Sequence, residues 1–463
     1  MTTASESLAA WVCSLDPPRL PPSAVHAAKR CVLDGIGVAL AGADTPWVER
    51  VLAVARAQEP RPRAGVLGHP DRLSAALAAL VNGTAVHALD YDDDPAACHI
   101  GAVVIPAALA MAEQVDASPM RFLTAVIAGY DVTTRIGEAV DSDRLYLRGF
   151  HPTAVCGVFG AAAAAASVLG LDAATTAQAL GIAGSFSSGN QEFLAEGAMT
   201  KRLQAGKASH DGVMAAQLAQ AGLTGPRAVL DGRYGFWRYT ESLDAPRFTR
   251  ALGERWVVGE VFVKKHASCL GNAPALDRVL EILRDEKLAP GDVAEIRLGV
   301  RASTLTMIGE PREIRVRPQT MLDAQMSLPF SLAVAMIDGE AGITQFAPER
   351  LHDPAVLAIA DRIHAYAHPD LASAKAGDLT SYLELTTQDG RCFRERLVTY
   401  RGHPDNPMSD EEMETKFRRC AGRRLSGRRV EAAVEAIWGL DKLTDLGPLL
   451  AAVEGSRIPR WTG

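Results

Sequence analysis

A run of 19 consecutive residues without a charge, residues 153–171 (TAVCGVFGAAAAAASVLGL), most constrains how this chain can fold. The run is close to the length that spans a bilayer. Its apolarity comes mostly from Ala and Gly, however, which contribute little to membrane insertion, and no second segment of this kind follows. We therefore expect a helix buried at the centre of a large helical domain, and no membrane partner.

Apolar residues recur at three- and four-residue spacing through most of the first 260 residues. This spacing predicts helices over residues 23–40, 47–58, 74–89, 106–114, 122–139, 154–169, 175–183 and 206–221. No alternating, strand-like run precedes about residue 255. Aromatic residues make up only 6% of the chain and Ala is abundant, which favours helices packed through small side chains. The predicted fold class is mainly α, with a large all-helical domain over residues 1–263.

The pattern changes between residues 264 and 404. Helical spacing at 273–284, 327–338 and 354–367 is interspersed with alternating runs at 293–300, 381–387 and 392–400, which predict strands. The last two runs flank an Asp-Gly turn, which is typical of a hairpin. We predict an inserted α+β lid domain over residues 264–404. Helices at 411–419 and 427–438, within residues 405–463, are expected to return to the helical domain.

Charge and cysteine usage narrow the classes of function. The 48 Lys and Arg residues against 55 Asp and Glu give a net charge of −7, so no basic field would attract nucleic acid. The seven cysteines are dispersed without a CxxC pair, which argues against a disulfide framework or a zinc ribbon and favours a reducing, cytoplasmic location. The first residues lack the basic and apolar regions of a signal peptide, so we expect none.

The densest polar segment is HALDYDDDPAACHIG, residues 87–101, in which four of five successive positions from Asp90 to Asp94 carry a carboxylate. Three interpretations are open. The segment is a solvated loop in which one Asp caps a helix. Alternatively, its carboxylates gather around Mg²⁺, as in all-helical prenyl-chain enzymes, although the spacing is not the usual one for that class. In the third interpretation, Asp90 and His99 form a general acid–base pair.

Two histidines stand just before predicted helices. His99 precedes an apolar run in which Pro106 marks the first helical turn, and His151 precedes Pro152 at the start of the uncharged helix. The partial positive charge of a helix N-terminus lowers the pKa of a histidine and keeps its imidazole neutral. A single histidine before a helix usually only caps it, so the prediction of a proton-transfer role rests on the two together.

Cationic side chains accompany these histidines. Lys201 begins KRL in a glycine-punctuated stretch, and Lys264 and His266 belong to KKHASC, where the predicted insert begins. Surface lysines are the simpler interpretation of each. Ligand clefts concentrate at junctions between domains, however. A cleft that combines cations with neutral histidines would suit a small polycarboxylate.

The chain resembles the MmgE/PrpD family over nearly its whole length. The resemblance rests on HALDYDDD with its following His, GFHPTAVCGVFGAAAAAASVLGLD, GIAGSFSSGNQEF, TKRLQAGKASHDG, LTGPRAVLDGRYGF, KKHASC and DAQMSLPFSLAVAMIDG, in this order. The family includes 2-methylcitrate dehydratases, cis-aconitate decarboxylases and iminodisuccinate epimerases. It implies a helical domain with an inserted α+β lid, a homodimer, and chemistry at a carbon next to a carboxylate that needs no metal or other cofactor.

Taken motif by motif, the resemblance implies roles for six residues. The catalytic residues would be Asp90, His99 and His151, and the substrate-binding residues Lys201, Lys264 and His266. The lysines would clamp a substrate carboxylate, while Asp90 and His99 would move the proton. His151 would protonate a leaving hydroxyl, or a carbanion if the reaction is a decarboxylation.

Two departures from the family pattern bear on specificity. Asp94 stands where the family usually has Thr, and Ile100 follows His99 where Pro or Gly is usual. The short loop between Asp90 and His99 is closer to the decarboxylase and epimerase branches than to the dehydratases. We expect a lyase, either a dehydratase or a decarboxylase, that acts on a di- or tricarboxylate. The alternatives are an epimerase of an aspartate-like dicarboxylate, a Mg²⁺-dependent prenyl-chain enzyme and a non-catalytic helical scaffold.

Overall fold

The uncharged run forms helix α8 (Pro152–Leu169), which lies in the core of the protein. In this computed structural model, which describes residues 2–58, 63–94, 98–372 and 378–455, α8 is the one described helix long and apolar enough to cross a membrane, and 89% of it is buried inside the protein. The expectation of a central core helix is thus confirmed. Its neighbours are α5 (Gly101–Gln114), α6 (Pro119–Val140), α9 (Ala173–Phe186) and α11 (Thr200–Gln220).

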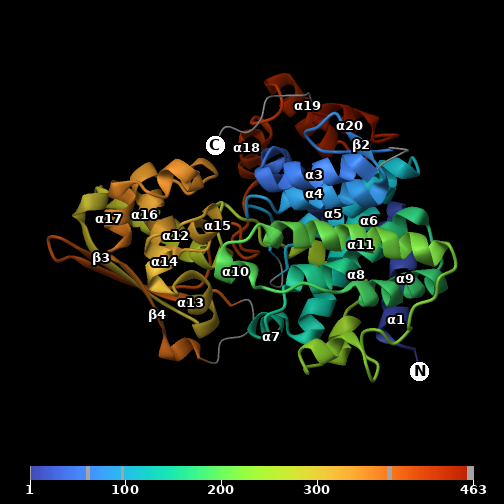
Figure 1. Ribbon diagram of the computed structural model, residues 1–463, viewed down its shortest axis with the longest axis horizontal. Helices are drawn as coiled ribbons and strands as arrows, with labels where there is room; N and C mark the ends of the chain where they lie inside the picture. Colours follow the sequence, from blue (N-terminus) through green and yellow to red (C-terminus); the bar gives the residue numbers. More distant parts are fainter. Residues whose placement is uncertain (1, 59–62, 95–97, 373–377, 456–463) are drawn as a thin grey trace.

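The first half of the chain forms a large helical body around α8 (Figure 1). Its remaining helices are α1 (Ala4–Ser14), α2 (Pro22–Gly42), α3 (Pro46–Gln58), α4 (Ala75–Val86), α7 (Ser142–Leu147) and α10 (Phe193–Glu196). Small residues let these helices approach closely: a Cβ added at Gly160 of α8 would lie 1.8 Å from Thr133 Oγ1 of α6. The abundance of Ala and Gly is therefore a packing requirement of this body.

The smaller body is built on a mixed sheet of four strands in the order β4-β3-β5-β6. The strands are β3 (Val293–Val300), β4 (Ile363–Ala367), β5 (Ser381–Thr387) and β6 (Cys392–Leu397), of which only β3 and β4 are parallel. Its helices are α12 (Ala273–Asp285), α13 (Ala302–Ile308), α14 (Arg312–Val316), α15 (Met321–Gln325), α16 (Leu328–Asp338) and α17 (Pro354–Ala360). Residues of β5 are alternately buried and half-buried, which fits a sheet with helices on one face.

Three expectations about local structure are wrong. The helix predicted over residues 354–367 ends at Ala360, and β4 replaces its second half because Ile363–Ala367 pairs with the free edge of β3. Helix α5 begins at Gly101, so Pro106 lies in its interior and not in its first turn. The expectation of no strand before about residue 255 is also wrong. The large body contains a short antiparallel pair, β1 (Ala64–Gly65) and β2 (Arg72–Leu73), which is too short to produce an alternating pattern in the sequence.

The last helices described are α18 (Asp410–Ala421), α19 (Gly427–Trp438) and α20 (Gly447–Val453). Helix α18 packs against α2, and the ammonium group of Lys416 forms a buried ion pair with Asp34. Arg424 donates a hydrogen bond to the carbonyl of Gly68 at 2.6 Å. The C-terminal segment thus lies on the large body, where α18 and α19 contact α2 (Figure 1). The domain boundaries at residues 263 and 404, and a lid function for the smaller body, stay predictions.

Candidate active site

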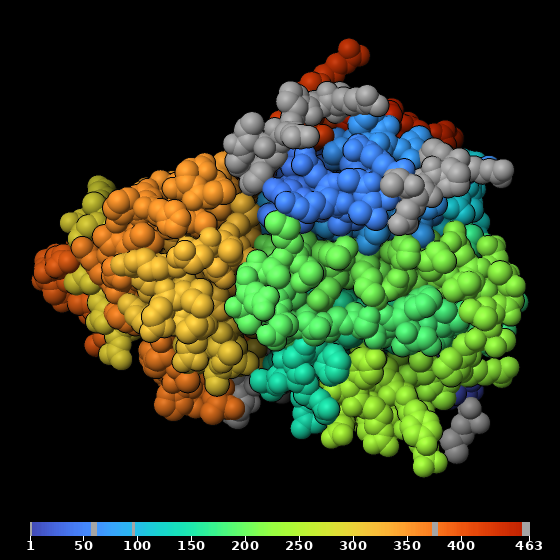
Figure 2. Space-filling model, viewed as in Figure 1, coloured from blue at the N-terminus to red at the C-terminus, as the bar shows by residue number. Residues whose placement is uncertain are grey.

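A cavity of about 910 Å³ lies between the large body and the smaller body. Figure 2 shows the two bodies meeting along a single seam, with the yellow and orange residues of the smaller body on one side. Five of the six predicted site residues line this cavity: Asp90, His99, His151, Lys201 and Lys264. Segments far apart in the sequence therefore converge on one site, as the resemblance implied.

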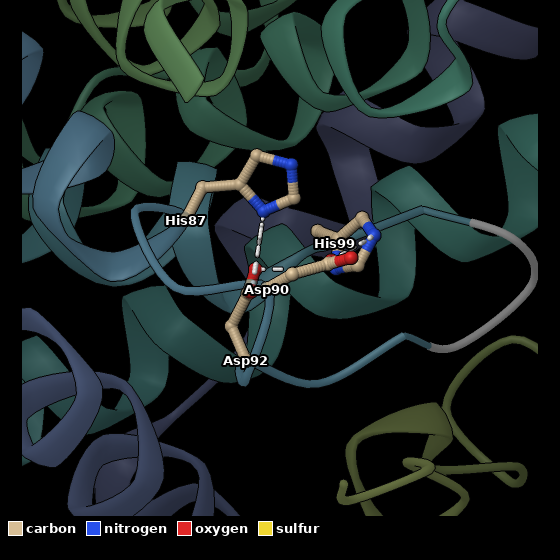
Figure 3. A group of neighbouring side chains, drawn as sticks. All are labelled: His87, Asp90, Asp92 and His99. Atoms are coloured by element: carbon tan, nitrogen blue, oxygen red, sulfur yellow. Dashed lines mark hydrogen bonds and ion pairs between the residues drawn. The ribbon is translucent and has the colours of Figure 1, made fainter. Parts of the chain in front are cut away.

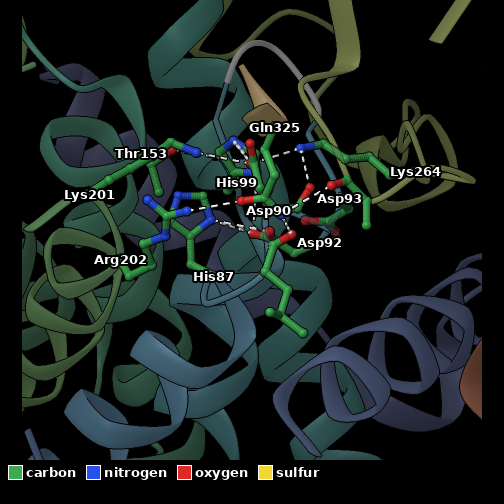
Figure 4. Close-up of polar contacts among 12 residues, drawn as sticks. His87, Asp90, Asp92, Asp93, His99, Thr153, Lys201, Arg202, Lys264 and Gln325 are labelled. Atoms are coloured by element: carbon green, nitrogen blue, oxygen red, sulfur yellow. Dashed lines mark hydrogen bonds and ion pairs between the residues drawn. The ribbon is translucent and has the colours of Figure 1, made fainter. Parts of the chain in front are cut away.

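Asp90 forms the anionic centre of the site (Figure 4). Its Oδ1 accepts hydrogen bonds from Lys201 Nζ at 2.9 Å and from Lys264 Nζ at 3.0 Å, and Lys264 Nζ also donates to the Asp90 carbonyl at 2.9 Å. Burial raises the pKa of Asp90, but the two ammonium groups outweigh this effect and hold the pKa well below its ordinary value. Asp90 is therefore a permanent carboxylate that positions two lysines.

The two lysines differ in how strongly they keep their protons. Burial lowers the pKa of Lys201, and the attraction of Asp90 only partly opposes this effect. Burial also lowers the pKa of Lys264, but the carboxylates of Asp90, Asp92 and Asp94 outweigh it and raise the pKa above the ordinary value. Lys264 thus carries the more strongly held positive charge in the cavity.

Asp92 binds two histidines at once (Figure 3). His87 Nδ1 lies 2.9 Å from Asp92 Oδ2, and His99 Nδ1 lies 3.2 Å from the same oxygen. The centres of the two imidazole rings are 4.3 Å apart. Burial lowers the pKa of His87 to about 3, so His87 is neutral and its Nδ1–H donates to Asp92.

His99 has the opposite protonation preference to the one that a helix N-terminus predicts. Burial lowers its pKa, but the carboxylates of Asp92 and Asp94 outweigh burial, and the net shift is upward. The expectation that the helix end lowers the pKa of His99 is therefore wrong, because the carboxylates of Asp92 and Asp94 dominate the shift. A histidine held in this way retains a proton that it can donate into the cavity.

His151 is the neutral histidine of the cavity. It is the N-cap residue of α8, as predicted, and burial, together with the ammonium charge of Lys201, lowers its pKa well below the ordinary value. Gln204 Oε1 lies 3.0 Å from His151 Nδ1, while Gln204 Nε2 donates to the Asn190 carbonyl. This arrangement places the proton of His151 on Nδ1 and leaves Nε2 as a buried acceptor with no partner among the described residues.

The carboxylates of the acidic segment, residues 90–94, have different surroundings. Asp93 turns away from the cavity, accepting hydrogen bonds from the Tyr130 hydroxyl and from Gly101 N, the first backbone N–H of α5. Burial raises the pKa of Asp93 to about 7. Asp90, Asp92 and Asp93 are at most 2% exposed, so the interpretation as a solvated loop is wrong. Asp94, at the position where the family usually has Thr, lines the cavity.

One group of side chains has the composition of a metal site. Single ligand atoms of His87, Asp90, Asp92 and His99 lie within 4.8 Å of one another. However, two ammonium groups contact Asp90 Oδ1, and their charge opposes the approach of a divalent cation. This donor set is therefore better suited to holding lysines and protons than to the Mg²⁺ cluster of a prenyl-chain enzyme.

His266 lies outside the cavity lining. Its Nε2 is 3.1 Å from Asp277 Oδ1, and Lys265 Nζ contacts the same oxygen at 2.7 Å. Asp277 belongs to α12, so this contact joins His266 to that helix. Because Asp277 Oδ2 also accepts from Arg401 N, this pair anchors the segment that carries Lys264.

Sequence reasoning missed two contributions to this site. Asp92 and His87 stand in the quoted acidic segment, yet Asp92 was considered only as one of several Mg²⁺ ligands and His87 had no role, although their spacing of five residues across a helix end allows contact. Gln325 was also missed: its Nε2 donates to the carbonyls of Leu89 and Ala267, and its Oε1 accepts from Arg202 (Figure 4). Gln325 therefore ties α15 to both segments that carry the charged groups.

Comparisons with known proteins agree with this architecture. Residues 6–249 match the MmgE/PrpD N-terminal domain, and residues 266–440 match the MmgE/PrpD C-terminal domain. The chain is 29% identical to the cis-aconitate decarboxylase-like protein oryM of Aspergillus oryzae, over 96% of each chain. It is 28% identical to human cis-aconitate decarboxylase, over 98% of this chain and 95% of the other, and 27% identical to the Aspergillus terreus enzyme of that name, over 95% and 94%. The chain belongs to the MmgE/PrpD family.

Proposed function

We propose that the protein is a lyase that removes CO₂ from a small unsaturated tricarboxylic acid of the cis-aconitate type. The relatives named above are described as decarboxylases of this acid and cover nearly the whole chain. The observation that carries the proposal is the pairing of His99 with Asp92 beside two lysines in one cavity. This arrangement provides a proton donor and a cationic wall for a substrate rich in carboxylates.

The decarboxylation needs one proton and no oxidant. The bond between the leaving carboxylate and its CH₂ carbon breaks, and the released electron pair forms a new carbon–carbon double bond. The electron pair of the former double bond then takes the proton of His99 Nε2, and solvent returns a proton to His99. Lys201 and Lys264 stabilise the carboxylate charge that grows on the reacting skeleton, an effect that is strong in a site shielded from water.

His151 has a different task in this proposal from the one implied by the resemblance. Because its pKa is lowered and its Nε2 is a free acceptor, it does not donate a proton at neutral pH. It accepts a hydrogen bond from a protonated group or a water beside the substrate, and so orients the substrate against His99.

The experiment that tests the function is incubation with cis-aconitate in D₂O, followed by NMR and by measurement of released CO₂. We expect CO₂ release and one deuterium per product molecule, at the carbon that His99 protonates. The His99→Gln variant is the matched control and should release little CO₂. Wild-type protein that leaves cis-aconitate unchanged, but loses water from a citrate-like acid, would replace decarboxylation with dehydration.

An epimerase is the second candidate, and one observation favours it. The cavity holds a histidine that retains its proton, His99, and a neutral histidine with a free acceptor, His151. Epimerisation next to a carboxylate needs such an acid and base together. Deuterium exchange at the α-carbon of an aspartate-like dicarboxylate, without loss of CO₂ or water, would support this candidate.

We also propose that the enzyme works without a metal or organic cofactor, in the cytoplasm, and as a homodimer. The first and third proposals rest on the family resemblance, and the second rests on the dispersed, unpaired cysteines. Light scattering coupled to size-exclusion chromatography tests the dimer directly, because a mass near twice 49.2 kDa is then expected.

A further inference from the structure

Arg315 is a buried cation in the cavity wall, on the side that the smaller body provides. It belongs to α14, lines the cavity and is only 5% exposed. Its Nε donates to the Glu310 carbonyl at 3.0 Å. Within the described part of the chain, its two terminal guanidinium nitrogens have no hydrogen-bond or ion-pair acceptor. An arginine in this state has an unused, planar pair of donors.

The other arginines of the wall are already engaged by the protein. Arg301 Nη1 lies 2.7 Å from Asp143 Oδ2, which joins the smaller body to α7 of the large body. Arg312 donates to the carbonyls of Ile363 and Asp361. Arg315 therefore differs from both neighbours in having an open binding face.

An unpaired buried charge is costly unless a ligand compensates it. Burial lowers the pKa of Arg315, and Asp323, the carboxylate that partly opposes this shift, is committed to capping α15 through Thr320 N and Oγ1. An anionic ligand would supply the missing partner. A carboxylate matches the guanidinium fork in shape, because two parallel N–H···O bonds form at once.

The cavity that Arg315 lines also has an apolar patch in its wall. Phe193, Leu322 and Met326 form this patch, and Cys269 packs against it. Cys269 lines the same cavity as Lys264 and Arg315. On the other side, the ring of Phe193 lies 5.3 Å from the ring of His151. The cavity wall thus combines the lysines beside Asp90, the guanidinium group of Arg315 and apolar side chains.

We propose that Arg315 binds a substrate carboxylate that does not react, and so makes the site select tricarboxylates over dicarboxylates. This inference rests on the proposed function for the class of substrate and deepens it. The carbon skeleton would lie along the apolar patch, with one carboxylate near Lys201 and Lys264 and another on the Arg315 fork. Arg315 is then a specificity-determining residue.

The test measures binding of unreactive analogues by calorimetry. Tricarballylate carries three carboxylates, and methylsuccinate and glutarate each lack one of them. We expect wild-type protein to prefer tricarballylate, and Arg315→Gln to weaken its affinity by about 10- to 100-fold, as for loss of a charge-assisted hydrogen-bond pair. The preference over at least one of the two dicarboxylates should collapse in this variant. Arg317→Gln is the matched control, because Arg317 pairs with Asp361 on the surface of the same segment.

Arg315→Lys covers the case in which Arg315→Gln does not fold. It keeps the charge but loses the planar fork, so we expect weaker tricarballylate binding with a smaller change for the dicarboxylates. Unchanged tricarballylate affinity in the folded variants, an equal loss for all three acids, or no tricarballylate binding by wild-type protein would overturn the inference. If tricarballylate binding depends on Arg315 but cis-aconitate releases no CO₂, the inference about Arg315 holds and the proposed function is wrong.

Discussion

His99 Nδ1 lies 3.2 Å from Asp92 Oδ2, whereas His99 Nε2 lies 3.9 Å from Asp90 Oδ1. The first distance is the closer ion-pair contact, so the carboxylate of Asp92 is the one paired with the His99 ring. Asp92 therefore orients His99, and Asp90 is left to hold the lysines. The left-handed backbone of Asp90, with φ of 52°, turns the chain between the two carboxylates. Neighbouring acidic residues thus make separate contacts: Asp92 pairs with His99, the proton donor of the proposed mechanism, and Asp90 contacts the two lysines.

Asp92→Asn is expected to move the alkaline limb of the activity profile to lower pH. Asp92 raises the pKa of His99, and the donor must be protonated, so activity falls as the pH rises through that raised pKa. Without the carboxylate the pKa of His99 drops, and the fall begins at lower pH. The pH dependence of kcat/KM measures the shift. His99→Gln should lower kcat by about 10²- to 10⁴-fold at every pH.

Two further variants calibrate this result. Asp94 also raises the pKa of His99, so Asp94→Asn should shift the limb in the same direction by a smaller amount. Asp361→Asn should not shift it, because Asp361 pairs with Arg317 on the surface of the smaller body. An unchanged limb in Asp92→Asn would show that His99 is not the titrating donor.

Asp90→Asn is expected to lower the stability of the fold and also the activity. It would leave two buried ammonium groups without their carboxylate, at a cost of about 3–5 kcal/mol in the free energy of unfolding. Adding Lys264→Met to this variant should recover part of the loss, because one orphaned charge is then removed. Urea denaturation measures both effects. The half-exposed Lys265 provides the control, since Lys265→Met should cost less than about 1 kcal/mol.

A double variant less stable than Asp90→Asn alone would contradict this view of the buried cluster. It would mean that Lys264 stabilises the fold through its packing or through its hydrogen bond to the Asp90 carbonyl, and not through the ion pair.

The sequence predicts the helical body well because its signals are local. Apolar spacing locates α8, and the Asp-Gly turn locates the hairpin of β5 and β6, since both patterns lie within one segment. The strand β4 is missed because its partner β3 lies far along the chain, and pairing overrides local propensity there.

For the site, too, features encoded within one segment could be predicted, whereas features that depend on contacts in the folded protein could not. The family resemblance identifies Asp90, His99 and Lys264 as cavity residues, and the structure agrees. Protonation could not be predicted in the same way, because the pKa of His99 depends on the distance and direction of Asp92 within a folded loop. Helix-end reasoning accounts for His151 but not for His99, where nearby carboxylates dominate.

Dialysis against EDTA is expected to leave activity unchanged. Asp90 Oδ1 already lies within 3.0 Å of two ammonium groups, which take the place of a cation. Activity is measured before and after dialysis, and again with added Mg²⁺ or Zn²⁺, because the cluster around His87 and Asp92 offers ligand atoms within 4.8 Å of one another. Activity that disappears with EDTA and returns with either ion would reassign this cluster as a metal centre.

Gly160→Ala is expected to destabilise the large body although it adds only one methyl group. The new Cβ would lie 1.8 Å from Thr133 Oγ1 and 2.6 Å from the Gly129 carbonyl oxygen, so α6 and α8 must move apart. Overpacking of this kind costs about 1–3 kcal/mol. Gly427→Ala in α19 is the control, because nothing lies within 4 Å of its Cβ and Ala favours the helix. Thermal denaturation should show a lower Tm for the first variant and an equal or higher Tm for the second. Equal melting temperatures for both variants would mean that α8 does not need its glycines for close packing, and that its composition reflects something other than the approach of α6.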